Sequence, residues 1–570
     1  MPAIENLQHA LPVYVNVYIA IFRYVAPVLA AILLFRAVWP LIRFRQEPEI
    51  WAWLCFPNGH KEPITHWENV IGRHKSSDVV IDLATVSRSH AVLTRYDDGS
   101  WSITEVEGAG GVLVNGKKVS IRALKKGDVI TIGGLEMQLQ PISQKQEKHL
   151  AHLRTRASSF PTSIANILML SVFQILTCIG FLMTGSDEQG RSYLLGFGII
   201  LISQWALFLF YVLINRPAFE VETIAFFLCT MGMAAICTVV PGEALKQAIS
   251  MVLGIAVFLT VGWALRDLER AKMMRYIAAV AGVGLLLATL LFGRNINGAK
   301  NWIIIGGMSI QPSELAKVCF VFVGASTLDL IMTKRNLIMF IGYSVIVCGC
   351  LALMSDFGGA LIFFCAFLIT AYMRSGSVGT IALACSSLVI AGVGVLRFAP
   401  HALGRFANWR HIWEHPLDGG YQQTQALICM ASGGMVGLGI NQGWMKNLFA
   451  AESDVVIATI GEEWGLFMVI LLVAGIAGLG VFSMRCSTMG RSTFYSIGSC
   501  TAATILVVQV ILNALGTVDV VPLTGVTFPF LSNGGSSMIC SWGLLGFIKA
   551  ADTRQNASFA VKRNRGEPDE

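Results

Sequence analysis

The chain has 570 residues, of which 54% are hydrophobic and only 14% are charged, and its mean hydropathy is +0.63. These values exclude an ordinary soluble protein, because apolar runs of about twenty residues recur and each is long enough to cross a bilayer. The net charge of +7 comes mostly from short loops beside these runs, which indicates membrane topology and argues against a nucleic-acid partner. The 13 cysteines lie without metal-site or disulfide spacing and are predicted to be packing residues.

Residues 1–45 are predicted to form an N-terminal transmembrane anchor. The apolar run from 13 to 42 is too long for a signal peptide and has no small-residue cleavage site. Arg43 and Arg45 close the run, so its C-terminal end is expected in the cytoplasm and the N-terminus outside.

Residues 46–142 change character, because charge returns and short alternating segments are separated by turn signals such as NG, DDG and KKGD. This pattern predicts a small all-β sandwich on the cytoplasmic side. A basic linker at 143–161 then leads into a multi-helix membrane domain over 162–550, and 551–570 is expected to be a cytoplasmic tail.

The sandwich carries three motifs: IGRH at 71–74, SRSHA at 87–91, and VNGKKV followed by LKKGDVITIG. As a set they resemble a forkhead-associated (FHA) domain, a family that binds phosphothreonine. Arg73, Ser87 and Arg88 are the expected phosphate contacts, through charge-assisted hydrogen bonds. The glycine-rich run 108–111 stands where the family usually has Ser-x-Asn-Gly, so a sandwich that only docks a partner is the alternative. His90 is expected to be a structural hydrogen-bonder.

The membrane domain is predicted to contain twelve further spans, which makes about thirteen transmembrane helices in a polytopic α-helical fold with the FHA-like sandwich inserted after the first helix. Basic loops after alternate spans place the sandwich and the C-terminus in the cytoplasm and loop 398–456 outside. The expected spans are 162–184, 193–214, 219–240, 246–265, 275–293, 313–332, 337–354, 358–373, 377–397, 457–483, 494–515 and 529–549.

Five motifs recur in order along this domain: NGAKNWIIIGGMSIQPSELAKV, SDFGGALIFF, GGYQQTQALICMASGGMVGLG, SDVVIATIGEEWGL and PLTGVTFPFLSNGGSSMI. Together they resemble the FtsW/RodA family, also called SEDS proteins, over residues 219–550. The resemblance implies polymerisation of peptidoglycan glycan strands from lipid II. Two departures stand out: Asn533 in the last motif, and two spans at 162–214 beyond the family's usual ten-helix core.

Intramembrane acids are costly, so Glu314, Asp356 and the pair Glu462–Glu463 are expected to be functional or paired. Lys317 lies one helical turn after Glu314 and is its predicted partner. For Glu314, a direct catalytic role and a structural ion pair that steadies the bundle both stay open. The glycines of SNGGSS are expected to serve packing more than substrate contact.

The implied reaction is attack of a sugar 4-hydroxyl on an anomeric carbon that bears a polyprenyl pyrophosphate, which needs a base and positive charge. In the family the key acid stands in a Trp-x-Asp-Pro segment, and His415 occupies that position here. Asp418, three residues later, is predicted to be the base or a metal-orienting acid, ahead of Glu414 and then His415.

The candidate pyrophosphate contacts are cations of the outward loop, each of which is equally compatible with a solvated surface charge. Together with the intramembrane pair, the predicted substrate-binding residues are Arg405, Arg410, Lys446, Glu314 and Lys317. No cofactor is fixed by the sequence, and a requirement for a divalent cation, Mg²⁺ or Mn²⁺, stays open.

Two functions of different classes fit these features: a glycan-strand polymerase regulated through the FHA-like domain, and a lipid-linked precursor transporter that forms no bond. The outward position of the acid-rich loop favours the polymerase. The resemblance implies a bacterial cytoplasmic-membrane location and a class B penicillin-binding protein as the crosslinking partner. Division, elongation and sporulation are equally compatible with the sequence.

Overall fold

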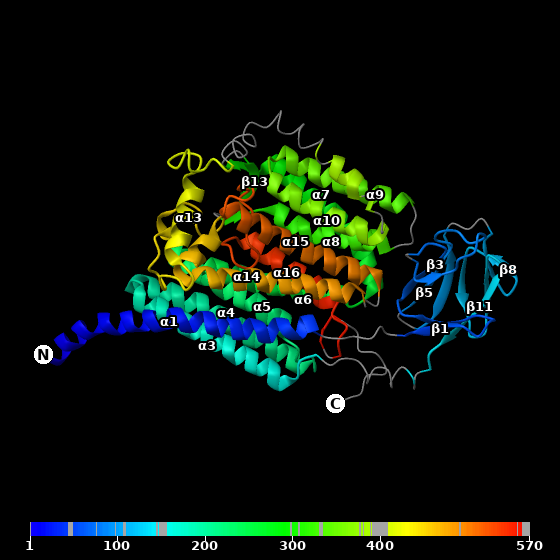
Figure 1. Cartoon of the computed structure of the whole chain (residues 1–570), viewed down its shortest axis with the longest axis horizontal. Helices are drawn as coiled ribbons and strands as arrows, with labels where there is room; N and C mark the ends of the chain where they lie inside the picture. The colour runs from blue at the N-terminus through cyan, green and yellow to red at the C-terminus, as the bar shows by residue number, and fades with distance from the viewer. Residues whose placement is uncertain are drawn as a thin grey trace.

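The computed structural model describes residues 2–43, 50–75, 77–96, 99–106, 110–143, 146, 157–296, 299–305, 308–329, 334–375, 378–379, 381–387, 389, 409–488, 492–555 and 557–560. A long helical bundle and a small β-sandwich stand apart, and the sandwich lies beyond one end of the bundle (Figure 1). The sandwich follows the first helix in the chain. The predicted fold class is therefore confirmed.

The sandwich consists of two mainly antiparallel sheets, in the orders β2-β1-β11-β10-β7-β8 and β4-β3-β5-β6-β9. Apolar residues that alternate along the strands, such as Leu54, Ile71, Ile103 and Ile130, are fully buried between the sheets. The strands are β1 (Ala52–Cys55), β2 (Lys61–Ile64), β3 (Glu68–Gly72), β4 (Val79–Val80), β5 (Ala91–Arg95), β6 (Trp101–Glu105), β7 (Val112–Val114), β8 (Lys117–Val119), β9 (Ile121–Leu124), β10 (Val129–Ile132) and β11 (Leu135–Pro141).

The bundle is built from long apolar helices that pack side by side (Figure 1). They are α1 (Pro2–Arg43), α3 (Phe160–Thr184), α4 (Asp187–Leu213), α5 (Glu220–Val239), α6 (Ala244–Leu265), α7 (Leu268–Phe292), α8 (Pro312–Asp329), α9 (Lys334–Leu353), α10 (Phe357–Ser375), α14 (Val456–Thr488), α15 (Thr493–Thr517) and α16 (Gly535–Ala550). α5 is the central element, since its apolar window is entirely buried by its neighbours.

Of the thirteen predicted spans, nine correspond to described helices that are long and apolar enough to cross a membrane. The run 358–373 forms a shorter apolar helix. The run 313–332 corresponds to α8, which carries charged residues, and the run 529–549 corresponds to α16, which is short. Most of the predicted span 377–397 lies outside the described residues.

The segment predicted as one long outward loop is partly helical. It contains α13 (Tyr421–Gly433) and the short 3-10 helix η2 (Met445–Asn447), which pack on α14 around a small apolar cluster of their own. A three-stranded meander, β12 (Arg294–Ile296), β13 (Ala299–Ile305) and β14 (Met308–Ile310), lies at the same end of the bundle as α13 (Figure 1).

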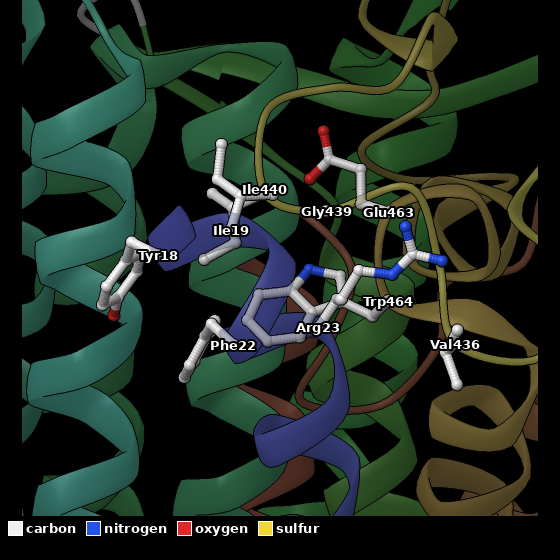
Figure 2. A pocket seen from close by; sticks show the side chains of 9 residues that line it. All are labelled: Tyr18, Ile19, Phe22, Arg23, Val436, Gly439, Ile440, Glu463 and Trp464. Atoms are coloured by element: carbon white, nitrogen blue, oxygen red, sulfur yellow. The ribbon is translucent and has the colours of Figure 1, made fainter. Parts of the chain in front are cut away.

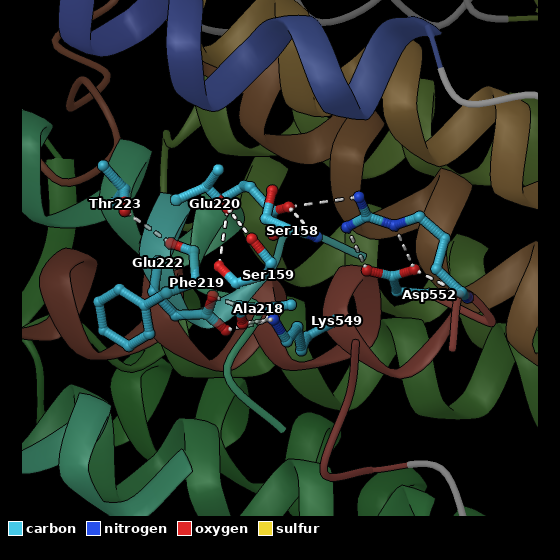
Figure 3. A network of polar contacts seen from close by, with 11 residues as sticks. Ser158, Ser159, Ala218, Phe219, Glu220, Glu222, Thr223, Lys549 and Asp552 are labelled. Atoms are coloured by element: carbon cyan, nitrogen blue, oxygen red, sulfur yellow. Dashed lines mark hydrogen bonds and ion pairs between the residues drawn. The ribbon is translucent and has the colours of Figure 1, made fainter. Parts of the chain in front are cut away.

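A buried ionic network joins three distant segments near the end of the bundle that faces the sandwich (Figure 3). Lys549 of α16 binds Glu222 of α5 at 3.0 Å with both side chains fully buried. Arg554 binds Asp552 at 2.7 Å and Glu220 at 3.5 Å. The backbone N–H groups of residues 157 and 158, at the end of the linker from the sandwich, donate to the Gln555 carbonyl and to the Glu220 carboxylate. Part of the predicted tail is thus buried in the bundle.

We expect Lys549→Met to destabilise the bundle, because it leaves the Glu222 carboxylate buried without its cation. Breaking a buried pair from one side costs about 3–5 kcal/mol. The detergent-solubilised protein should therefore show an apparent Tm several degrees lower by fluorescence-detected size exclusion. The double variant Lys549→Met/Glu222→Gln should recover most of the loss, since no unpaired charge remains. Equal Tm values for the single variant and the wild type would contradict the assignment.

Candidate functional site

The turn before α13 is anchored to the segment between α15 and α16, at the end of the bundle away from the sandwich (Figure 1). The Trp409 indole N–H donates to the Val520 carbonyl at 3.2 Å. The Arg410 backbone N–H donates to the Asp519 carboxylate at 3.1 Å, with Arg410 in the left-handed region at φ 64°. These bonds fix where the turn begins and leave the Arg410 side chain exposed.

The three predicted catalytic side chains lie on this one turn, and all are exposed. Glu414 pairs with His411 Nδ1 at 2.8 Å, and this hydrogen bond lowers the pKa of the Glu414 carboxyl. The His415 carbonyl accepts the backbone N–H groups of Asp418 and Gly420, at 3.3 and 3.1 Å. The turn therefore brings Glu414, His415 and Asp418 together at the mouth of the bundle and does not insert Asp418 into its interior.

Glycine at position 420 closes this turn. A Cβ there would lie 2.4 Å from the Ile412 carbonyl oxygen, and Ile412 is itself buried. Since no other residue fits this backbone approach, the GGYQ motif fixes the path of the chain into α13.

The predicted phosphate-binding cations do not all fall in the described part of the chain. Arg405 lies outside the described residues. Lys446 is exposed on η2. Glu462 forms hydrogen bonds with the backbone of the two residues that precede Lys446. The Glu462 carboxylate accepts the backbone N–H groups of Trp444 and Met445, both at 2.9 Å. A buried acid thus positions the cation-bearing turn.

Three of the intramembrane acids that are expected to be functional or paired, Asp356, Glu462 and Glu463, accept backbone N–H groups. Glu463, next to Glu462, accepts the Thr238 hydroxyl at 2.8 Å and the Gly443 N–H at 3.4 Å. Asp356 accepts the Gly359 N–H at 2.8 Å at the start of α10. These carboxylates satisfy helix starts and turns that would otherwise leave amide groups unpaired.

The predicted pair Glu314–Lys317 is present at 2.6 Å and is buried. The second carboxylate oxygen of Glu314 has no hydrogen-bond partner among the described residues. Close by, the Ser536 hydroxyl accepts the Gln311 backbone N–H at 2.9 Å. The Asn533 backbone N–H likewise donates to the Glu452 carbonyl at 2.8 Å. Two residues of the SNGGSS segment are thus hydrogen-bonded to neighbouring segments of the bundle.

Sequence reasoning assigned no role to Glu452, which the fold singles out. Burial, and secondarily the charges of Asp454 and Glu243, raise the pKa of its carboxyl. The amide of Asn533 also reaches Glu243, at 3.4 Å across 290 residues of sequence. Only the SDVVIATIGEEWGL motif next to Glu452 hinted at this position. Within the described residues no three His, Cys, Asp or Glu side chains converge as a metal site.

The FHA-like motifs meet at one end of the sandwich. The Arg73 N–H donates to the Ser87 carbonyl at 3.0 Å, and the His74 N–H donates to the Arg88 carbonyl at 3.2 Å. The Arg73 and Arg88 side chains are exposed and Ser87 is half-buried. His90 is fully buried and accepts the Ser87 N–H at Nδ1, so it is the structural residue that was predicted. The three predicted phosphate contacts thus share one loop cluster.

Comparisons with known proteins agree with this division of the chain. The profile of the FtsW/RodA/SpoVE family, described as "Cell cycle protein", matches residues 239–557, and the FHA domain profile matches residues 69–133. The fold and site therefore define a multi-pass membrane protein that carries an FHA domain. The chain belongs to the FtsW/RodA/SpoVE family.

Relatives of known name support this membership. The chain is 27% identical to "Peptidoglycan glycosyltransferase RodA" of Mycobacterium leprae, over 67% of this chain and 89% of that protein. It is 31% identical to "Probable peptidoglycan glycosyltransferase FtsW" of Tolumonas auensis, over 53% of this chain and 82% of that protein. A solved structure titled "Structural coordination of polymerization and crosslinking by a peptidoglycan synthase complex" shares the fold, with a TM-score of 0.50 and 23% identity over 58% of this chain and 96% of that chain.

The raised pKa of Glu452 predicts a pH dependence. A buried carboxyl whose folded pKa exceeds its unfolded value stabilises the fold while protonated, and this contribution is lost as the pH rises through the folded pKa. The Tm of the wild type should therefore fall relative to Glu452→Gln as the pH rises from 4.5 upward. Glu414→Gln is the matched control of opposite sign, because its lowered pKa gives stability that is lost as the pH falls. Parallel curves for wild type and Glu452→Gln would refute the assignment.

Proposed function

We propose that this protein is a peptidoglycan glycosyltransferase that polymerises glycan strands from lipid II in the bacterial cytoplasmic membrane. The observation that carries the proposal is the family match over the bundle, combined with a turn that presents carboxylates and cations together at one end of it. The distribution of basic loops supports a topology with that end outside and the sandwich in the cytoplasm. Curated relatives with the names given above support the same activity.

In the proposed reaction, Asp418, Arg410, Lys446 and Glu462 have different roles. Asp418 takes the proton from the attacking 4-hydroxyl as the new C–O bond forms at the anomeric carbon. The bond from that carbon to the pyrophosphate oxygen breaks, and the pyrophosphate leaves with the electron pair. Arg410 and Lys446 stabilise its charge. The Glu462 carboxylate keeps the Lys446 turn in place through its two backbone bonds.

Glu452 is the alternative base. A general base works best with a pKa near the operating pH, and the pKa of Glu452 is raised toward it. Glu414, in contrast, is paired with His411, and the pKa of its carboxyl is lowered. This leaves Asp418 and Glu452 as the two carboxylates to distinguish.

The competing function is a transporter of the same lipid-linked precursor. Purified protein in liposomes with lipid II separates the two, because a synthase forms glycan ladders and a transporter moves lipid II without forming polymer. We further propose a class B penicillin-binding protein as the crosslinking partner. Its addition to the same liposomes is expected to raise the polymer yield, and an unchanged yield would speak against the partnership.

Asp418→Asn is expected to reduce polymerisation by about 10²–10⁴-fold, the usual contribution of a general base. The substitution preserves size and hydrogen bonding, so expression and lipid II binding should stay near wild type. Gel-resolved glycan polymer from equally loaded proteoliposomes measures the effect.

Glu414→Gln, His415→Gln and Glu452→Gln belong in the same assay as controls and should be milder. A near-normal Asp418→Asn beside an inactive Glu452→Gln would move the base to Glu452. Full activity in all four variants would exclude this turn and its neighbour as the source of the base.

We also propose that the FHA domain binds a phosphothreonine protein and regulates the enzyme. The support is the loop cluster in which the Arg73, Ser87 and Arg88 backbones are tied together beside two exposed guanidinium groups. A phosphate between these groups gains charge-assisted hydrogen bonds that an unmodified threonine lacks.

Arg73→Ala is expected to weaken phosphopeptide binding by at least about tenfold, because a hydrogen bond to a charged group contributes roughly 1.5–3 kcal/mol. Isothermal calorimetry on the full-length protein, with a phosphothreonine peptide library and its unphosphorylated counterparts, measures this. Lys117→Ala is the matched control, because it removes a cation from the exposed strand β8, outside the loop cluster. Equal binding of phosphorylated and unphosphorylated peptides by the wild type would make the domain a plain docking module.

A further inference from the structure

A lysine on an edge strand of the sandwich lies near the end at which the predicted phosphate contacts meet. Lys118 is the middle residue of β8, which forms one edge of its sheet (Figure 1). β8 pairs antiparallel with β7, and Val119 lies opposite Val112, the first residue of β7. β8 therefore ends where β7 begins. Lys118 lies opposite the half-buried Leu113, so both side chains are on the outer face of this hairpin.

Gly111, just before β7, gives the Lys118 side chain a path across the hairpin. A Cβ on Gly111 would lie 3.0 Å from the Lys118 Nζ and still closer to its Cε, and Gly111 has φ 74°. Any other residue at position 111 would push the lysine side chain away. Lys118 is exposed, and its amino group forms no ion pair with another described residue. The Lys118 ammonium thus lies beside Gly111 without an acidic partner from the described part of the chain.

A single imidazole connects Gly111 to the loop that carries two of the predicted phosphate contacts. His90 is fully buried, and its Nδ1 accepts the Ser87 N–H at 3.1 Å. Its Nε2 therefore carries the proton and donates to the Gly111 carbonyl at 3.2 Å. These two hydrogen bonds and the ring between them span on the order of 8 Å, the length of two to three residues of an extended peptide. The Lys118 ammonium is thus a few peptide residues away from a phosphate held at Ser87.

The chemistry of this position favours a carboxylate. An ammonium on a flexible stem is a point charge that pairs with an acidic group without demanding a fixed geometry. The phosphate itself is assigned to the loop cluster, where two guanidinium groups are exposed. A second negative charge on the same ligand, at the distance spanned by His90, meets Lys118. Lys117 does not share this position, because it lies opposite Val114 and its side chain leaves β8 on the other face.

We propose that Lys118 is a specificity-determining residue of the FHA domain, which selects phosphothreonine peptides that carry an acidic residue two or three positions from the phosphothreonine. The loop cluster holds the phosphate, and the Lys118 ammonium binds the carboxylate of the ligand beside Gly111. This inference rests on the phosphothreonine binding proposed above and adds the class of ligand, an acidic phosphopeptide.

Fluorescence anisotropy on the full-length protein in detergent tests the inference. The probes are labelled phosphothreonine peptide pools in which one position, from three before to three after the phosphothreonine, is Glu or Gln and the others are random neutral residues. We expect the wild type to bind a Glu pool about fivefold more tightly than the Gln pool at a position two or three residues away, as for an exposed ion pair. High salt should reduce this preference through screening.

Lys118→Ala should lose the preference for Glu and still bind phosphorylated pools more tightly than unphosphorylated ones, which shows that the domain is folded. Lys117→Ala is the matched control, since it removes the neighbouring cation and should keep the preference. Lys118→Glu should reverse it, so that a pool with Lys at the same position binds more tightly than the Glu pool.

The outcomes separate this inference from the phosphothreonine binding on which it rests. A wild type that binds phosphorylated pools without preferring Glu at any position would overturn the role of Lys118 alone. The same holds for a preference that Lys118→Ala retains, or that Lys117→Ala and Lys118→Ala lose equally. Equal binding of phosphorylated and unphosphorylated pools by the wild type would overturn both proposals.

Discussion

The candidate site depends on a backbone-to-backbone contact between residues 434–439 and residues 462–466 of α14. The N–H groups of Leu438 and Gly439 donate to the carbonyls of Glu462 and Glu463, both at 2.9 Å, and the Leu466 N–H donates back to the Gly434 carbonyl at 2.9 Å. The side-chain carboxylates of Glu462 and Glu463 accept three more backbone N–H groups, those of residues 443–445. An irregular segment at membrane depth is stable only when its amides are satisfied in this way.

This contact explains why two sequence motifs, SGGMVGLG and GEEWG, contain glycine at particular positions. In SGGMVGLG, a Cβ on Gly437 would lie 2.1 Å from the Glu463 carbonyl oxygen, and the residue has φ 84°. In GEEWG, Gly465 has φ 84° and its Cβ would lie 2.3 Å from the Met435 carbonyl oxygen. Each glycine admits the backbone of the other motif, so neither motif is stable without its partner.

Sequence reasoning reached the parts of this structure that local patterns encode. Apolar run length gave the spans, and strand alternation gave the sandwich. The spacing of Glu314 and Lys317 gave a pair that the fold realises at 2.6 Å. It missed what tertiary structure alone brings together: the carboxyl of Glu452 beside Glu243, and the pairing of Glu220 with Arg554 across 334 residues. It also described 398–456 as a loop, because the short helix α13 has no span-length hydrophobic run that would identify it.

The three N-terminal helices α1, α3 and α4 pack against the core of the bundle. α1 packs against α3, α5 and α14, and α3 and α4 also contact α5, so together they help to bury α5, the central helix. The sandwich is inserted between α1 and α3, which means that both of its connections lead into helices of this group. At the far end of α1, a Cβ on Gly439 would lie 2.4 Å from Ile19, and Phe22 meets Trp464. Close-packed interiors have little free space, so a displacement of α1 is opposed directly by Gly439 and Trp464 (Figure 2). α1 is thus one continuous helix, Pro2–Arg43, that makes a tight contact with residues 439 and 464 in its N-terminal half.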